Sequence, residues 1–274
     1  MPVLEEYPIV INQGNLPLII TAPHGGLQKP TTIPDRKQEG SLLLADMYTR
    51  EIAQGIMKGI SDHYHENKAT PHIIINRIAR RKVDVNRPLN EGTESKQGEV
   101  VWKEYHHRVQ QAIESVKREY GFGIMIDIHG HTHSNEMVEL GYLLETNDLT
   151  LNIPHLDQLI LQKSSIGSLV KRYQDTKQPH QLLYLLGDML TSYSENKITV
   201  VPSTYNPKPQ NDMDYFSGGY TTQAYHKHID MIQLEIPKSI RLNETNRAYC
   251  IQVIVQAMVH LLDTYYLATS RNKL

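Results

Sequence analysis

This sequence has a single cysteine, no marked excess of one charge and no long apolar run, and each of these absences excludes a class of protein. The single cysteine, Cys250, cannot form an intramolecular disulfide and fits a reducing compartment. Lysine and arginine number 28 against 30 aspartates and glutamates, and the formal charge of -2 suggests no nucleic-acid partner. No apolar run approaches the roughly 20 residues that span a bilayer. Residues 1–7 lack the basic start and apolar stretch of a signal peptide. We therefore expect a cytoplasmic protein that acts away from membranes.

The chain is long enough, at 274 residues, to bury a sizeable core. It contains no internal repeat, low-complexity tract or linker. We predict that residues 1–274 form a single domain, whereas the oligomeric state stays open.

Short apolar runs alternate with amphipathic stretches along the chain. The apolar runs predict strands at 8–11, 16–21, 71–76, 123–126, 138–145 and 229–236. Helical periodicity predicts a helix capped by Ser41 and carrying Leu44, Met47 and Ile52, followed by helices at 100–120, over most of 150–200 and at 244–268. This alternation predicts an α/β fold, a three-layer α/β/α sandwich.

The most unusual stretch is 127–133, Asp-Ile-His-Gly-His-Thr-His, where His129, His131 and His133 occupy alternate positions. It follows the apolar run 123–126, so we expect it where a strand runs out into a loop, the place where α/β sheets bind ligands. Histidine is a poor core residue and a mediocre turn former, so packing gives no reason for the pattern. Binding of a divalent metal ion gives a reason for the pattern.

Three further groups of polar residues follow predicted strands. His24 lies in a Pro-His-Gly-Gly turn, a basic loop spans 77–88, and Glu235 interrupts an apolar run. A hydrolytic zinc site needs about three protein ligands and one open position for water. It also needs a base for the water's proton and a cation for the developing oxyanion. These groups contain residues of all the required kinds.

In order and spacing, these residues resemble the successive motifs of the N-formylglutamate amidohydrolase family, which is similar in fold to the zinc carboxypeptidases. The resemblance runs from about residue 20 to residue 240. It is carried by Pro23-His24-Gly25-Gly26, Asp46-x-x-Thr49, Arg81-x-x-Asp84-x-Asn86-Arg87, Asp127-x-His129, Gly218-Gly219-Tyr220 and Gln233-x-Glu235. It implies a carboxypeptidase/phosphorylase-hydrolase-like sandwich with a mixed central sheet.

The resemblance also implies a ligand set for one Zn²⁺ ion. His24, Asp46 and His129 match the ligands, and Asp35 is the substitute if Asp46 is not one. Asp127 matches a group that orients a ligand.

The remaining matched positions carry the catalytic and substrate-binding roles. Glu235 occupies the position of the carboxylate that activates water, and Arg81 that of the arginine that polarises the scissile carbonyl. Asn86 and Arg87 resemble the pair that holds a substrate carboxylate, for which the planar guanidinium is well suited. Gly218 and Gly219 belong to a polar loop that can close over the substrate.

Simpler interpretations exist for several of these residues. Asp84 fits a salt bridge to a neighbouring arginine, and Glu235 fits a pair with Arg241. We expect Arg77, Arg80 and Lys82 to be solvated charges. His131 fits either an added metal ligand or a contact to a substrate oxygen, and His133 fits a surface residue. The other histidines, including His72 and His106, fit ordinary surface or helix positions.

The sequence therefore predicts a zinc-dependent amidohydrolase that cleaves a non-peptide C–N amide bond in a small acidic substrate similar to N-formylglutamate. One alternative is a carboxypeptidase-like hydrolase acting on a γ-glutamyl or other peptide or protein substrate. The other is a non-catalytic metal-binding relative.

Overall fold

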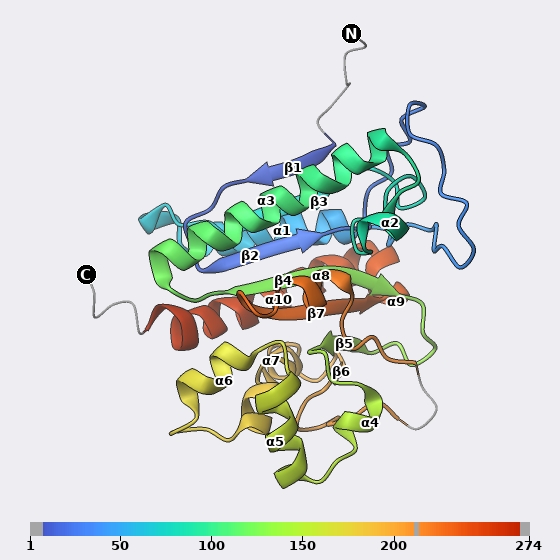
Figure 1. Cartoon of the computed structure of the whole chain (residues 1–274). Helices are drawn as coiled ribbons and strands as arrows, with labels where there is room; N and C mark the ends of the chain where they lie inside the picture. The colour runs from blue at the N-terminus through green and yellow to red at the C-terminus, as the bar shows by residue number, and fades with distance from the viewer. Residues whose placement is uncertain (1–7, 211–213, 269–274) are drawn as a thin grey trace.

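A mixed seven-stranded sheet runs through the middle of the protein (Figure 1). The computed structural model describes residues 8–210 and 214–268. The strand order is β1-β3-β2-β4-β7-β5-β6. The strands are β1 (Ile9–Asn12), β2 (Leu18–Ala22), β3 (His72–Asn76), β4 (Ile124–His131), β5 (Val138–Gly141), β6 (Val200–Val201) and β7 (Asp230–Pro237). Strands β3, β2, β4 and β7 are parallel, whereas β1 and β5 run antiparallel to their neighbours β3 and β7.

Helices cover both faces of the sheet, as Figure 1 shows. The longer ones are α1 (Thr49–His63), α3 (Lys96–Tyr120), α5 (Ile153–Lys163), α7 (Pro179–Tyr193) and α10 (Glu244–Leu262). The shorter ones are α2 (Leu89–Gly92), α4 (Thr146–Leu149), α6 (Gly167–Tyr173), α8 (Tyr220–Tyr225) and α9 (Lys238–Leu242). Helices α1, α7 and α10 pack together on one face, and α3 contacts β1, β2 and β3 from the other.

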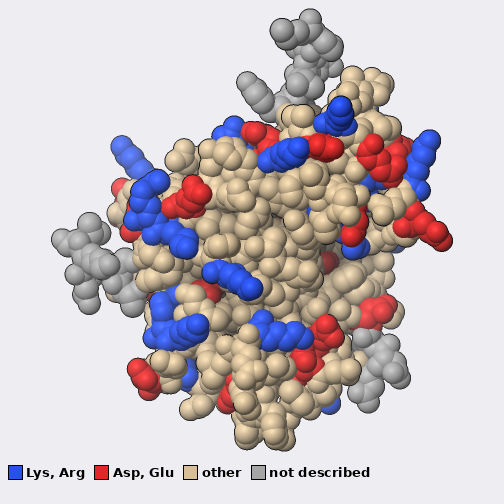
Figure 2. Space-filling model, viewed as in Figure 1, with Lys and Arg blue, Asp and Glu red and all other residues tan. Residues whose placement is uncertain are grey.

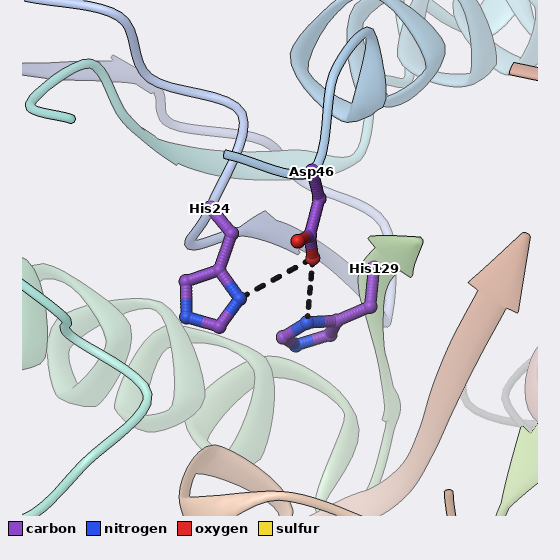
Figure 3. A group of neighbouring side chains, drawn as sticks. All are labelled: His24, Asp46 and His129. Carbon is purple, nitrogen blue, oxygen red and sulfur yellow. Dashed lines mark hydrogen bonds and ion pairs between the residues drawn. The ribbon is translucent and has the colours of Figure 1, made fainter. Parts of the chain in front are cut away.

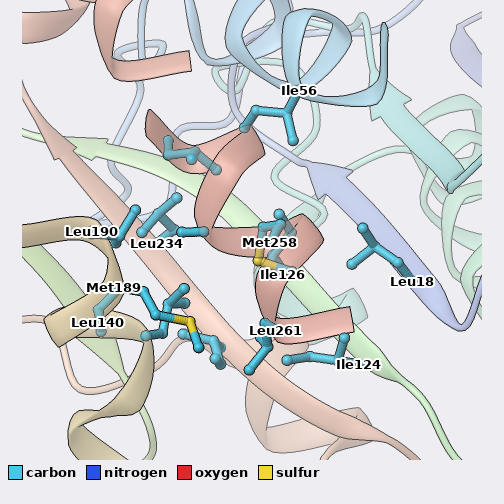
Figure 4. Packing of buried hydrophobic residues seen from close by; sticks show 14 of the residues in the cluster. Leu18, Ile56, Ile124, Ile126, Leu140, Met189, Leu190, Leu234, Met258 and Leu261 are labelled. Atoms are coloured by element: carbon cyan, nitrogen blue, oxygen red, sulfur yellow. The ribbon is translucent and has the colours of Figure 1, made fainter. Parts of the chain in front are cut away.

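Side chains alternate between two apolar cores, one on each face of the sheet. In β4, Ile124 and Ile126 join the core beneath α1 and α10, whereas Met125 joins the core beneath α3. Figure 4 shows the first core, where Ile56 and Met258 pack beside the strand residues. The period of two is the reason that these strands, buried on both faces, read as continuous apolar runs. The predicted three-layer α/β arrangement is confirmed.

The predicted helix from Ser41 onward is wrong in its first turns. Helix α1 begins only at Thr49, because Tyr48 has a φ of 69° and cannot continue a right-handed helix. Asp46 instead lies at the turn before the helix, and its backbone carbonyl oxygen accepts a hydrogen bond from the Thr49 hydroxyl at 2.8 Å. Leu44, predicted to pack on the apolar stripe, is 84% exposed.

Other boundaries differ less. Helix α3 starts at Lys96, four residues before its predicted start, with Ser95 as N-cap. Strand β4 continues to His131, so His129 and His131 lie within the strand and only His133 lies in the segment after it. The short strand β6 was not predicted. Residues 1–7, which lack signal-peptide features, and residues 211–213 of the polar loop lie outside the described part of the chain.

Helix α10, together with the following turn to Leu267, is long and apolar enough to cross a membrane by length and composition. Half of that apolar window is buried inside the protein, where α10 packs against α1 and α7. This burial is typical of the core helix of a sandwich.

The surface agrees with the balanced composition. On the face that Figure 2 shows, charged side chains of both signs are interspersed among uncharged ones.

Candidate metal centre

Two histidines and an aspartate from distant parts of the chain meet at the carboxyl end of the parallel strands (Figure 3). His24 follows β2, His129 lies in β4, and Asp46 comes from the turn before α1. The backbone N–H of Asp46 donates to the carbonyl of His24 at 3.0 Å, which fixes the turn against the strand end. Their ligand atoms lie within 4.8 Å of one another, so the three side chains can share one metal ion.

Both imidazoles present the same nitrogen to the aspartate. Nδ1 of His24 lies 3.3 Å and Nδ1 of His129 lies 3.4 Å from Oδ2 of Asp46. The two rings are edge-on, with centroids 4.8 Å apart. The side chains point toward one another around a common centre, as Figure 3 shows.

The outer nitrogen of each imidazole is held by a second buried carboxylate. Nε2 of His24 lies 2.7 Å from Asp84, and Nε2 of His129 lies 2.9 Å from Asp127. Burial raises the pKa of Asp84 and of Asp127, but hydrogen bonds and charges from the imidazoles outweigh it and lower both pKa values. Both acids therefore stay ionised and can only accept hydrogen bonds. Each Nε2 therefore carries a hydrogen, which leaves Nδ1 as the nitrogen that can bind a metal ion on the side of Asp46. Nδ1 of both imidazoles and Oδ2 of Asp46 converge on one centre, so a divalent cation there would take the place of the proton that Nδ1 of His129 shares with Asp46 in the metal-free protein.

The charge of the site also favours binding of a metal ion. Four buried carboxylates surround the imidazoles, those of Asp46, Asp84, Asp127 and Glu235. Among the described residues, the guanidinium groups of Arg80 and Arg36 form ion pairs with them. Arg80 lies 2.9 Å from Asp84 and 3.7 Å from Asp46, and Arg36 lies 3.5 Å from Asp84. Because buried charge is costly without a partner, the excess of carboxylates favours binding of a divalent cation.

Glu235 lies beside this centre without belonging to it. In the sheet it is the direct neighbour of His129, and its Oε1 lies 4.0 Å from Nδ1 of that histidine. Oε1 accepts a hydrogen bond from Gln233 at 2.9 Å, whereas Oε2 is buried and has no hydrogen-bond partner among the described residues. Burial raises the pKa of Glu235 to about 8. A buried carboxyl of this kind is suited to accept and return a proton near neutral pH.

Arg241, the structural partner considered for Glu235, is occupied elsewhere. Its guanidinium donates to the carbonyl oxygens of Ile236, Met47 and His131 at 2.8–3.0 Å. It thus ties together the segments that carry Glu235, Asp46 and the end of β4.

A cavity of about 470 Å³ opens over the candidate centre. Its wall includes Asn86, Arg87, Gly218 and Gly219, as well as Glu235. Asn86 is held in place because its Oδ1 accepts two hydrogen bonds of 2.8 Å from Thr221. The backbone N–H of Gly219 donates to Gln233 at 2.6 Å, so the glycine loop is linked through Gln233 to Glu235.

Two predictions for the basic loop differ from the structure. Arg81 forms a salt bridge of 2.6 Å with Asp35 and is not among the residues lining the cavity. Arg80, predicted to be solvated, lines the cavity with a side chain only 13% exposed. Asp35 also pairs with Lys82 at 2.9 Å and lies outside the cluster, so Asp46 rather than Asp35 is placed to bind metal. In a loop, sequence alone does not show which of two adjacent arginines faces inward.

Other residues of the network lacked a sequence signal. Asp84 forms the predicted salt bridges to arginines, but its bond to His24 was not predicted. Arg36 is buried, and its Nη2 lies 3.5 Å from Oδ2 of Asp84, although it comes from a proline-rich loop with no motif. His72 and His106, predicted to lie at ordinary surface or helix positions, are buried, and burial lowers the pKa of each to about 4.

His131 and His133 form a second cluster with Glu139. Nε2 of His131 is bonded to the Met137 carbonyl at 2.7 Å, and its Nδ1 accepts from the backbone N–H of His133 at 3.1 Å. Nδ1 of His133 lies 2.8 Å from Glu139. The two nitrogens of His131 are thus both bonded to protein atoms.

Comparison with known proteins identifies the fold. No protein-family model matches the sequence, and neither does any curated protein. Among solved structures, an N-formylglutamate amidohydrolase from Ralstonia eutropha JMP134 aligns over 97% of this chain and 99% of its own, with a TM-score of 0.55 and 13% identity. A gene product of Agrobacterium tumefaciens aligns over 93% and 94%, with a TM-score of 0.51 and 13% identity. The chain thus has the fold of an N-formylglutamate amidohydrolase.

Proposed function

We propose that this protein is a metal-dependent amidohydrolase that cleaves the C–N amide bond of a small N-acyl amino acid. One observation carries the proposal. Two imidazoles oriented by buried carboxylates turn their Nδ1 atoms toward Oδ2 of Asp46, next to a buried carboxyl with an unbonded oxygen. The fold shared with an N-formylglutamate amidohydrolase supports the same reaction class.

His24, Asp46 and His129 would hold the metal, which we propose is one Zn²⁺ ion. Three nitrogen and oxygen ligands leave the open coordination position that a catalytic zinc site requires. Zinc chemistry at such a site makes water nucleophilic near neutral pH and polarises a carbonyl oxygen.

Protein groups supply the proton transfer and part of the charge stabilisation. Glu235 accepts the proton of the attacking water and passes it to the leaving nitrogen, with Gln233 holding its Oε1 in place. Arg80, which lines the cavity, takes the role in oxyanion stabilisation for which the sequence favoured Arg81.

The substrate carboxylate is assigned to Asn86 and Arg87. The Arg87 side chain is exposed at the cavity wall, and no carboxylate of the described residues lies within 4.0 Å of its guanidinium. Gly218 and Gly219 provide a part of the wall without side chains, where a substrate can approach the backbone beside Asn86, which a Cβ at Gly219 would meet at 2.4 Å.

The test combines metal content with turnover. The purified protein is expected to contain one metal ion per chain by elemental analysis and to release amine from a panel of N-formyl and N-acetyl amino acids. Glu235→Gln is expected to lower kcat by about 1,000-fold or more and to leave the metal content intact, because Glu235 is not a ligand.

Three outcomes would contradict the proposal in different ways. Retained activity of the Glu235→Gln variant would remove Glu235 from the role of base. Hydrolysis of γ-linked peptides in place of N-acyl amino acids would replace the substrate class. Bound metal without hydrolysis of any compound would indicate a non-catalytic relative.

A further inference from the structure

We infer that the substrate carries a single carboxylate and an apolar side chain, so that the preferred compound is an N-acyl derivative of an apolar amino acid such as leucine or methionine. The inference rests on the proposed function and concerns its specificity. N-formylglutamate, the compound named for the structural relative, carries two carboxylates. The cavity of this protein offers a partner to only one of them.

The charges of the cavity wall support this conclusion. Among the described residues, the lining contains two guanidinium groups, those of Arg80 and Arg87, and no lysine. Arg80, which is paired with Asp84 at 2.9 Å and with Asp46 at 3.7 Å, is assigned to the oxyanion beside the metal. Arg87 is therefore left for one substrate carboxylate. Glu91, which also lines the cavity, makes the wall less favourable for a second carboxylate.

An apolar surface lies beside Arg87. Leu42 lines the cavity together with Arg87, and the same two residues line a smaller adjoining recess. Leu42 is 52% exposed, and it begins a run of three leucines of which Leu43 is 36% and Leu44 is 84% exposed. Three consecutive exposed apolar residues have no structural reason on a surface and are typical of a binding site.

The leucine run is held in position by a buried side chain. The guanidinium of Arg36, itself 4% exposed, donates to the carbonyl oxygen of Leu42 at 2.6 Å and to the hydroxyl of Ser41 at 3.4 Å. Arg36 also pairs with Asp84, which orients the metal ligand His24. The apolar surface is therefore fixed relative to the candidate centre, as a specificity surface must be.

A second exposed apolar side chain completes the lining. Phe216 is 42% exposed, lines the cavity, and is stacked on His133 at a centroid distance of 4.6 Å. Its backbone N–H donates to Glu139 at 2.9 Å. The lining thus offers a substrate side chain apolar surface at Leu42 and Phe216, and among the described residues it holds no cation besides Arg80 and Arg87.

The experiment compares N-acetylleucine and N-acetylmethionine with N-acetylglutamate and N-acetylaspartate as substrates of the metal-loaded protein. We expect kcat/KM to be about tenfold or more higher for the apolar pair, a ratio that a hydrophobic contact combined with an unpaired carboxylate can supply. Leu42→Lys is expected to shift the ratio toward glutamate by about tenfold, because it introduces a partner for the second carboxylate. Leu161→Lys is the matched control, since Leu161 is a similarly exposed leucine on α5, away from the cavity lining, and its ratio is expected to stay unchanged.

A binding measurement separates this inference from the proposed function. Calorimetry with the metal-loaded Glu235→Gln variant measures affinity for N-acetylleucine and N-acetylglutamate without turnover. Tighter binding of the leucine compound supports the inference even if no amide is hydrolysed, an outcome that would defeat the proposed function alone. A preference for glutamate, equal affinities, no binding of either compound, or an unchanged ratio in Leu42→Lys would each overturn it.

Discussion

Two clusters of histidine and carboxylate lie only a few residues apart along β4 and differ in what their nitrogens contact. In the first cluster, His24 and His129 give their outer nitrogens to Asp84 and Asp127 and turn Nδ1 toward Asp46. In the second, the two nitrogens of His131 are bonded to the Met137 carbonyl and the His133 amide. Of the two clusters, only the first directs Nδ1 of both imidazoles at one carboxylate oxygen.

Two clusters of similar composition can therefore differ in the partners of their nitrogens. Both clusters contain two histidines and at least one buried carboxylate, and both have ligand atoms within 4.8 Å of one another. What distinguishes them is the carboxylate behind each imidazole of the first cluster, which holds a hydrogen on Nε2 and makes Nδ1 the nitrogen that can bind a metal ion once its proton is released. The second cluster instead connects the end of β4 to β5 and to the loop at Phe216.

The largest effect is expected from removing a ligand of the first cluster. His129→Ala should weaken zinc binding by more than about 100-fold, because the loss of an outer partner alone costs 10- to 100-fold. Dialysis against a metal buffer followed by elemental analysis measures the change. His180→Ala serves as control, since His180 pairs with Asp157 at 2.9 Å outside the site. Full metal content in the His129→Ala variant would show that the metal is bound elsewhere.

The outer carboxylates carry the next largest effect. Asp84→Asn should weaken zinc binding by about 10- to 100-fold, because an amide can present its NH₂ to Nε2 of His24 and favour the wrong tautomer. Asp157→Asn is the matched control, as it alters a histidine–aspartate pair that contacts neither cluster. Equal zinc affinities of the two variants would refute the role assigned to the outer carboxylate.

The pH dependence of metal binding sharpens the same contrast. Burial lowers the pKa of His129, but Asp127, Asp46 and Glu235 outweigh burial and hold it well above its ordinary value in the metal-free protein. Below this raised pKa, zinc must displace a proton, so the apparent affinity should fall by about tenfold per pH unit for each proton released. Calorimetry in buffers of different ionisation enthalpy counts these protons. Zinc binding that releases no proton near neutral pH would contradict the assignment of His129 as a ligand.

The sequence predicted six of the seven strands and most of the helices, because apolar periodicity is a local property of the chain. The order of the motifs, through the family that they resemble, predicted that His24, Asp46 and His129 come together, which they do. Prediction from the sequence failed where the structure depends on tertiary contacts. Tyr48 adopts a left-handed conformation that no local pattern indicates, and so the helix expected from Ser41 starts at Thr49. The choice between Arg80 and Arg81 depends on which side chain meets Asp84, a contact made only after folding.

The smallest effect on metal is expected from the second cluster. His133→Gln should leave the zinc stoichiometry at one per chain and the affinity unchanged, because His133 contacts Glu139 and Phe216 rather than the ligands. Since Phe216 lines the cavity and stacks on His133, the variant is expected to raise KM by a few-fold with little change in kcat. Kinetics on the metal-loaded variant beside zinc titration separates the two quantities. If His133→Gln abolished zinc binding, the second cluster would be a ligand set, and the orientation of Nδ1 would no longer distinguish a metal site from a structural one.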